Sequence, residues 1–224
     1  MSLVPSATET LLAWGVTPIG VTRFCEHPEL AAFGGTKDPH VEEIAALAPD
    51  LVVVCVEENR REDADRLDAL GLRLHAIDIR GVGDVEPELD RLARALGVEM
   101  PSVDLPPRRP ATGLRAFVPI WRRPWMTVAA DTYVSSVLEW VGLGNAYDDS
   151  VDRYPTIELD DAIARAPDVV VAPDEPYPFA ERHRAELELV APAWLIDGKD
   201  VTWWGVRTVG AVERLGALVD QLDP

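Results

Sequence analysis

One phrase occurs twice in this 224-residue sequence, and the repetition constrains the fold more than any other feature. "APDLVVVCVEEN" occupies residues 48–59, and "APDVVVAPDEP" occupies residues 166–176. Each copy continues from Ala-Pro-Asp into an aliphatic run and places a glutamate seven residues after the aspartate, at Glu57 and Glu175. An acidic pair also precedes each copy, Glu42-Glu43 and Asp160-Asp161. Such repetition indicates one structural unit used twice.

The first half of the chain alternates the patterns of strands and helices. A continuous aliphatic run such as "DLVVVCV" is typical of a strand covered on both faces of a parallel sheet. Capping boxes at Ser6–Glu9 and Asn59–Glu62, with an Asp38-Pro39 start, predict where helices begin. We expect strands at 2–5, 19–22, 50–56 and 74–78, and helices at 6–14, 39–47 and 59–71.

The second half follows the same plan. "RAFVPIW" and "DVVVAP" predict strands, Asp131 is expected to cap a helix, and apolar residues at helical spacing predict a closing helix. The expected strands cover 115–121, 168–173 and 192–197, and the expected helices cover 132–142, 160–166 and 206–222.

A helix at about 84–97 and a proline-rich strap lie between the halves. We therefore predict an α/β fold with two lobes, each a mostly parallel sheet flanked by helices, and a ligand cleft between them. The predicted domains are 1–83, the linker 84–113, and 114–224. One doubly wound sheet is the alternative, because its βαβ units also resemble one another. Two lobes are preferred because whole blocks recur in the same order.

Charge and composition narrow the range of partners. The net charge is −18, which disfavours nucleic acid and anionic membrane surfaces. No run of 18 apolar residues predicts membrane insertion, and no secretory leader pattern is present, so the protein as written is expected to stay in the cytoplasm. Cys25 and Cys55 suit neither a disulfide framework nor a zinc site.

Aromatic residues gather where the predicted strands end, which is where open parallel sheets bind ligands. Trp121 ends a predicted strand, and Trp125, Trp203 and Trp204 lie in predicted loops, together with Tyr154 and Tyr177. A wall of such rings suits a large, flat and partly apolar ligand. The alternative is that the tryptophans pack the interface between the lobes.

Acid–base chemistry has weaker support. Glu57 and Glu175 are related by the repeat, but a catalytic pair needs a short separation and shifted pKa values; each glutamate could instead stabilise a helix N-terminus or line the cleft. His27 is the one histidine in a candidate cleft loop, and the histidines lack metal spacing. No nucleophile elbow, P-loop or dinucleotide motif occurs. An enzyme is therefore the weaker hypothesis, and no cofactor is expected to be required.

Several motifs together resemble a known family. "SLVPSATETL", "VTRFCEHP", "GGTKDPHVEEIAALAPDLVVV", "FVPIWRRPWM", "RYPTIELDDA" and "DEPYPF" are similar to the bilobed, helical-backbone substrate-binding proteins of ABC importers. That family includes periplasmic cobalamin-binding proteins and haem and ferric-siderophore receptors. The resemblance implies two α/β lobes, a corrinoid or metal chelate as ligand, an ABC permease as partner, and an extracytoplasmic location if the true start lies upstream.

The resemblance also transfers to individual positions. Family cleft tryptophans correspond to Cys55 and Tyr154 here. The acidic residues that dock onto the permease correspond to Asp160 in the second lobe and to Arg61 in the first, where Glu62 is adjacent.

We therefore expect a non-catalytic protein that binds cobalamin, haem or a ferric chelate. Arg23, Arg122 and Arg123 are expected to pair with acidic groups of the ligand. The expected ligand-binding residues are Arg23, Phe24, His27, Thr36, Lys37, Glu57, Glu58, Trp121, Arg122, Trp125, Tyr154, Glu175, Tyr177, Trp203 and Trp204. Two alternatives remain: an enzyme or cofactor-handling protein that uses Glu57, Glu175 and His27, and an interaction module that uses the aromatic loops on a flat surface.

Overall fold

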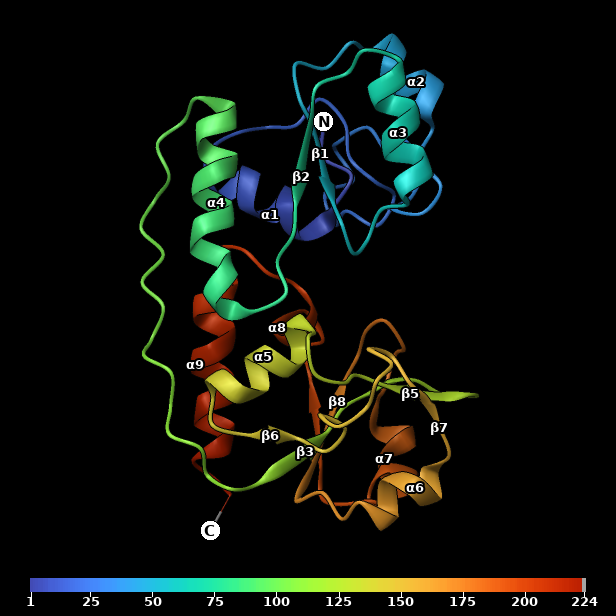
Figure 1. The fold of residues 1–224 in the computed structure, drawn as a ribbon, viewed down its shortest axis with the longest axis vertical. Helices are drawn as coiled ribbons and strands as arrows, with labels where there is room; N and C mark the ends of the chain where they lie inside the picture. The colour runs from blue at the N-terminus through green and yellow to red at the C-terminus, as the bar shows by residue number, and fades with distance from the viewer. Residues whose placement is uncertain (223–224) are drawn as a thin grey trace. The chain divides into compact units, whose positions relative to one another are not determined.

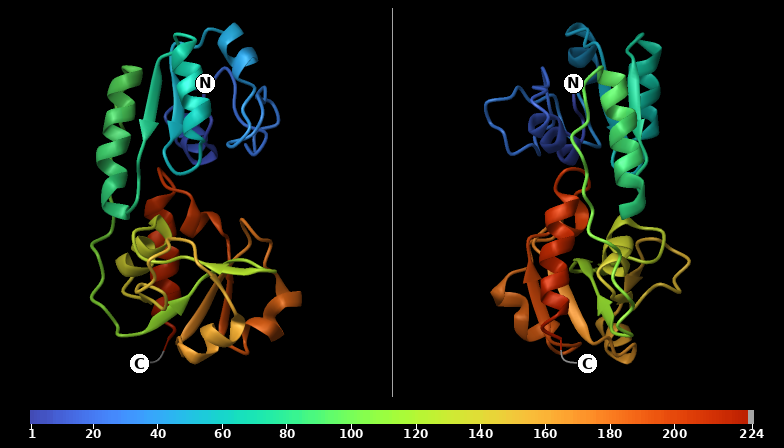
Figure 2. Two further views of the ribbon diagram at one scale, coloured as in Figure 1. Left: turned by 45° about the vertical axis from the view of Figure 1, so that its right-hand side comes forward. Right: turned by 90° about the vertical axis from the view of Figure 1, so that its left-hand side faces the viewer.

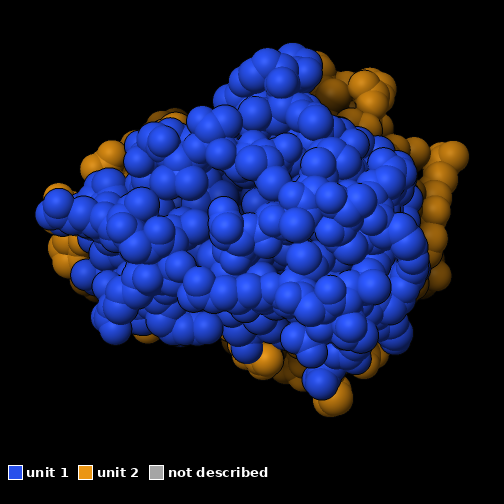
Figure 3. Space-filling view, turned by 90° about the horizontal axis from the view of Figure 1, so that it is seen from above, with its two compact units in different colours: residues 1–79, 83–103, 204–206 blue, residues 80–82, 104–203, 207–224 orange. Residues whose placement is uncertain are grey.

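The computed structural model describes residues 1–222, which divide into two compact units (Figure 1). Unit 1 comprises residues 1–79, 83–103 and 204–206, and unit 2 comprises 80–82, 104–203 and 207 onward (Figure 3). No helix among the described residues is long and apolar enough to cross a membrane.

Unit 1 is built on two parallel strands, β1 (Val52–Cys55) and β2 (Leu74–Ile77), and Ser2 forms a parallel bridge to Val53 beside them. All four residues of β1 are buried, as its aliphatic sequence predicted. The helices of this unit are α1 (Pro5–Ala13), α2 (Val41–Ala46), α3 (Arg61–Ala69) and α4 (Val82–Leu96), of which α4 belongs to it from Gly83 onward. Leu3, Ile44 and Leu67 pack against β1 in the core.

Unit 2 contains a four-stranded parallel sheet and a small antiparallel sheet (Figure 2). The parallel sheet has the order β6 (Gly144–Asn145), β3 (Arg115–Phe117), β8 (Val169–Pro173), β9 (Ala193–Ile196). The antiparallel sheet has the order β4 (Pro119–Trp121), β5 (Trp125–Thr127), β7 (Thr156–Ile157). The helices are α5 (Tyr133–Trp140), α6 (Leu159–Ala164), the 3-10 turn η1 (Glu181–His183), α7 (Arg184–Leu187), α8 (Lys199–Thr202) and α9 (Thr208–Val219). The predicted α/β class with mostly parallel sheets is confirmed.

The repeated phrase folds into the same local structure in both units. A six-residue helix with two acidic residues in its first turn precedes a buried strand in each, α2 before β1 and α6 before β8. Between helix and strand, Ala48 and Ala166 both adopt a left-handed backbone with φ of 46°. The 118-residue offset is therefore a structural repeat.

Some local predictions are wrong. Residues 19–22 form no strand, only a single bridge from Val21 to Ala32. The run 115–121 is divided between two sheets, since β3 ends at Phe117 and β4 begins at Pro119. Helix starts also differ. α1 begins at Pro5, which places Ser6 inside the helix, and α2 begins at Val41 after His40. Thr132, not Asp131, caps α5 by accepting a hydrogen bond from the Ser135 amide.

The proline-rich strap is anchored to unit 2 from residue 104 onward. The Trp140 indole donates to the Pro106 carbonyl (2.8 Å), and the Arg109 amide donates to the Trp140 carbonyl (2.9 Å). The Arg109 guanidinium also bonds to Gly216 and Asp220 near the end of α9. These bonds fix the position of a segment that has no regular secondary structure.

Candidate ligand-binding residues

Asn59 connects three segments of unit 1 at the end of β1. Its Oδ1 accepts from the Cys55 amide (2.8 Å), and its Nδ2 donates to the carbonyls of Leu3 (3.2 Å) and Thr36 (2.9 Å). Lys37 Nζ then donates to the Glu57 carbonyl (3.0 Å). The structure therefore brings Thr36, Lys37 and Glu57 together. The predicted capping role of Asn59 is wrong, because Arg60 is the N-cap of α3 and makes no side-chain cap bond.

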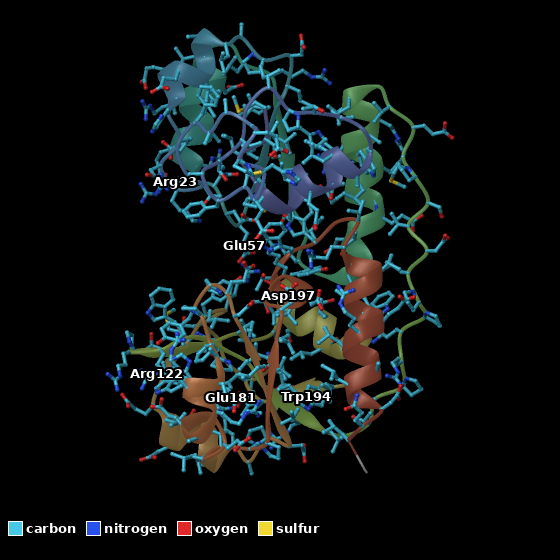
Figure 4. All side chains as sticks on the ribbon, turned by 180° about the vertical axis from the view of Figure 1, so that it is seen from behind. Arg23, Glu57, Arg122, Glu181, Trp194 and Asp197 are labelled. Carbon is cyan, nitrogen blue, oxygen red and sulfur yellow. The ribbon has the colours of Figure 1, made fainter. Side chains whose placement is uncertain are left out.

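Arg23 and Phe24 lie in an adjacent loop of unit 1. The Arg23 guanidinium makes two bonds of 2.9 Å to the Asp38 carboxylate, and this cation lowers the pKa of Asp38. Gly35 lies directly beneath the pair, and a Cβ there would lie 2.5 Å from Asp38 Oδ1 and 2.9 Å from Arg23, so the two side chains would have to shift to admit one. Arg23 also lies over the half-exposed Phe24 ring, 4.9 Å from its centroid. Its charge is therefore already paired within the protein. Figure 4 marks the position of Arg23 in unit 1.

His27 is exposed and pairs with a neighbouring acid. Its Nδ1 lies 3.0 Å from Glu29 Oε1. The Glu29 pKa is lowered, first by a bond to its own backbone and then by His27. Among residues 1–222, no three His, Cys, Asp or Glu side chains gather in a way that could hold a metal ion.

Unit 2 presents a cluster of aromatic rings that grades from buried to exposed. Trp125 (8% exposed) stacks on Phe179 (3% exposed) with centroids 5.9 Å apart and an interplanar angle of 11°. Tyr177 contacts both Phe179 (4.7 Å) and Trp121 (5.7 Å), and Trp121 is 42% exposed. The His183 ring packs against Tyr177 and Phe179. Trp125 is thus part of the buried portion of the cluster. Tyr177 is half-buried and Trp121 is exposed.

The turn between β4 and β5 follows directly from Trp121. Arg122 donates from Nε to Glu186 Oε2 over 2.7 Å, and this bond raises the pKa of Arg122. Tyr154, which precedes β7, is also exposed, and the Arg153 guanidinium lies 5.6 Å from its ring centroid. The sequence did not predict this hairpin, because its strands are only three residues long and an Arg-Arg-Pro turn gives no standard hairpin signal.

Glu175 and Trp203 form a second group in unit 2. Glu175 Oε1 accepts from Thr202 Oγ1 (2.7 Å), and burial raises the pKa of its carboxyl. The Lys199 ammonium and the Arg207 guanidinium lie 5.1 and 5.8 Å from the Trp203 ring centroid. Trp204 belongs to unit 1 instead and is buried, so the two adjacent tryptophans serve different units.

The two predicted docking acids both lie in the first turns of exposed helices. Asp160 is in α6 and Glu62 is in α3. The structural repeat pairs Asp160 with Glu42 of α2, because the offset is 118 residues and both helices precede the buried strand. The acidic pairs that precede each copy of the repeated phrase, Glu42-Glu43 and Asp160-Asp161, show the same correspondence in the sequence. Glu42 lies 2.6 Å from Arg66.

No protein-family profile matches the chain. The chain is 23% identical over 191 residues to a vitamin B12-binding protein of Salmonella choleraesuis and 27% identical over 189 residues to one of Yersinia pestis. These matches cover 76% of this chain and 70% and 68% of the respective relatives.

Solved structures have the same fold. The periplasmic vitamin B12-binding protein BtuF of Vibrio cholerae has a TM-score of 0.78 at 20% identity, with 99% of this chain and 97% of that chain covered. A periplasmic haem-binding protein of Pseudomonas aeruginosa has a TM-score of 0.78 at 18% identity, with 100% and 93% covered. The chain therefore has the α/β fold of these periplasmic binding proteins, as its motifs indicated, and its sequence is similar to that of vitamin B12-binding proteins.

Proposed function

We propose that this protein is a non-catalytic substrate-binding protein for ABC-type uptake and that it binds a corrinoid, a haem or a related metal chelate. The observation that carries the proposal is the graded aromatic cluster of unit 2. The buried Trp125 and Phe179 rings stack on each other, Tyr177 packs on Phe179, and the exposed Trp121 ring packs on Tyr177. The names of the curated relatives and of the solved structures support the choice of ligand.

A rigid exposed indole favours a flat ligand on energetic grounds. Burying about 100 Å² of apolar surface contributes about 2.5 kcal/mol. The T-shaped contact of Trp121 with Tyr177 also reduces the freedom that the ring loses on binding. The cluster therefore supplies affinity for a broad apolar face without needing a specific polar contact.

The hydrogen-bond partners of His27 and Glu175, two of the side chains that an enzyme would use, favour the non-catalytic proposal. His27 is paired with Glu29, and Glu175 accepts a hydrogen bond from Thr202. An enzyme that uses Glu57, Glu175 and His27 is therefore the less favoured proposal.

The protein is also proposed to work outside the cytoplasmic membrane and to dock onto a permease. The solved structures of the same fold are described as periplasmic. Asp160 and Glu42 are exposed acids at equivalent positions of the repeat, and they are the proposed docking residues in place of Glu62. Reversing both charges is expected to leave ligand affinity unchanged and to reduce uptake.

Calorimetric titration with cyanocobalamin, haem and a ferric siderophore tests the ligand proposal. Wild-type protein is expected to bind at least one of the three, and Trp121→Ala is expected to bind it about 10- to 100-fold more weakly. Trp14→Phe in unit 1 is the control and should keep the wild-type affinity. Absence of binding by the wild-type protein at ligand concentrations of about 100 μM, well above the affinities typical of specific sites, would refute the proposal.

A further inference from the structure

Among residues 1–222, four residues other than glycine have a left-handed backbone: Ala48, Arg123, Asp131 and Ala166. Ala48 and Ala166 occupy equivalent positions of the repeat, after α2 and α6. Asp131 is held by Arg80 and Arg153, which bond to its carboxylate and its carbonyl. Arg123 lies in the tight turn of the β4–β5 hairpin, where a positive φ is common but is usually supplied by glycine, asparagine or aspartate.

Arg123 stands in the turn between β4 and β5 with φ of 67°. Any residue with a Cβ atom is unfavourable in this region, whereas glycine adopts it without strain. Strained residues of this kind concentrate at functional sites, because selection keeps a side chain there despite its cost to stability. We therefore expect the guanidinium of Arg123 to have a functional role.

The charges of the other two candidate arginines are already paired. Arg23 makes a two-bond pair with Asp38, and Arg122 bonds to Glu186. The Arg123 side chain is exposed and makes no hydrogen bond or ion pair within the described part of the chain. Of the three, Arg123 is the one whose guanidinium remains available to a ligand.

The turn places this guanidinium two residues from an exposed ring. Trp121 ends β4, Trp125 begins β5, and Arg123 lies between them. A flat ligand that lies on Trp121 would bring a group at its edge close to Arg123. Guanidinium groups match the paired oxygens of carboxylates and phosphates, which makes an acidic group the expected partner.

We propose that Arg123 is a specificity-determining residue that binds a carboxylate or phosphate at the edge of the flat ligand. This inference rests on the proposed function and names the ligand class more closely: an acid-bearing macrocycle. The acid has two possible sources, the propionates of a haem or the phosphodiester of a corrinoid, and the experiment distinguishes them.

The test compares two pairs of probes that differ in the acidic group. Haem is paired with its dimethyl ester, and cyanocobalamin is paired with dicyanocobinamide, which lacks the phosphodiester. Affinities are measured for wild type, Arg123→Gly, Arg123→Lys and the control Arg73→Ala. Arg73 is likewise exposed but lies before β2 in unit 1, so its removal changes the net charge equally.

Arg123→Gly is expected to bind the acid-bearing probe of one pair at least about tenfold more weakly and the acid-free probe equally well. Arg123→Lys should lose less, and Arg73→Ala should bind like wild type. Because glycine relieves the strain, the melting temperature of Arg123→Gly should equal or exceed that of wild type. This readout separates lost recognition from misfolding.

Each of the remaining experimental outcomes refutes one specific claim. If wild type binds a probe and Arg123→Gly binds both members of that pair with unchanged affinity, the role of Arg123 is refuted while the proposed function stands. An equal loss of affinity for both members of the pair also refutes acid recognition. If wild type binds no probe, the proposed function itself fails, and this inference fails with it.

Discussion

The side chain of Asn59 shows how one residue organises a loop of the candidate site. It satisfies backbone groups from Leu3, Thr36 and Cys55, which are far apart in the sequence. A sequence pattern reports only local partners, so the Asn-x-x-Glu spacing was interpreted as a helix cap. The interpretation failed because two of the three partners, Leu3 and Thr36, become neighbours of Asn59 only in the fold.

Asn59→Ala is expected to destabilise the protein by about 1–3 kcal/mol, because the backbone groups it satisfies would lose their partners. Urea denaturation checks this. Glu62→Ala, three residues further on and exposed, is the control and should change the free energy of unfolding by less than about 0.5 kcal/mol. An equal effect of both substitutions would show that Asn59 has no special role.

Glu175 makes stability depend on pH in a defined direction. Burial raises its pKa above the ordinary 4.5, so the folded protein binds this proton more tightly than the unfolded chain does. The stabilising effect of the proton is complete below pH 4.5 and is lost as the pH rises through the higher folded pKa.

Glu175→Gln should therefore gain stability relative to wild type as the pH rises across that window. Urea unfolding of both proteins at pH values below and above it measures the difference. Glu181→Gln, at an exposed residue of η1, is the control for the exchange of a glutamate for a glutamine. A difference between Glu175→Gln and wild type that stays constant with pH would contradict the burial of this carboxylate.

At the scale of elements, α8 and α9 are joined through one buried carboxylate. Asp200 is 5% exposed and accepts two bonds from Arg214 (2.6 and 2.7 Å) and one from Arg207 (3.3 Å). This carboxylate connects the short helix α8, which immediately precedes Trp203, to the twelve-residue helix α9.

Asp200→Asn is expected to lower the free energy of unfolding by about 1–3 kcal/mol, because charge-assisted bonds at a buried site are lost. Thermal and urea denaturation measure the loss. The matched control is Asp65→Asn, whose pair with Arg61 is exposed on α3 and should contribute less than about 0.5 kcal/mol. Equal effects would mean that burial does not strengthen the Asp200 bonds.

The elements that could be predicted share a strong, regular signal. The aliphatic runs of β1 and β8 and the apolar periodicity of α9 identified those elements from local sequence alone. The elements β5, α7 and α8 were missed because each has only three or four residues. Such short elements are set by their neighbours rather than by their own pattern.

The candidate site was predicted unevenly for the same reason. The Trp121–Tyr177 pair comes from two segments whose aromatic content is visible in the sequence, and the two rings do contact each other in the structure. The burial of Trp125 and the pairing of Arg23 with Asp38 depend on packing across segments. Composition shows that such groups exist but not which of them remain exposed.

At the scale of the whole molecule, a net charge of −18 is expected to reduce stability by self-repulsion. Salt screens such repulsion over a Debye length of about 10 Å at 0.1 M. The melting temperature should therefore rise between low-salt buffer and about 0.5 M sodium chloride, where charges more than a few ångströms apart are screened. Potassium chloride should give the same rise, since screening does not depend on the cation. A fall in melting temperature with either salt would show that attractive pairs outweigh the excess charge.

The three residues 204–206 have a consequence for any attempt to divide the protein. Although they follow almost all of unit 2 in the sequence, they belong to unit 1, where the Val206 amide faces Thr10 Oγ1 and Gly205 lies against α1. Neither half of the gene therefore encodes a complete folding unit. A single cut between the units would separate α1 from residues 204–206, which it normally contacts. This matters for fragment complementation and for chimaeras that combine halves of two homologues.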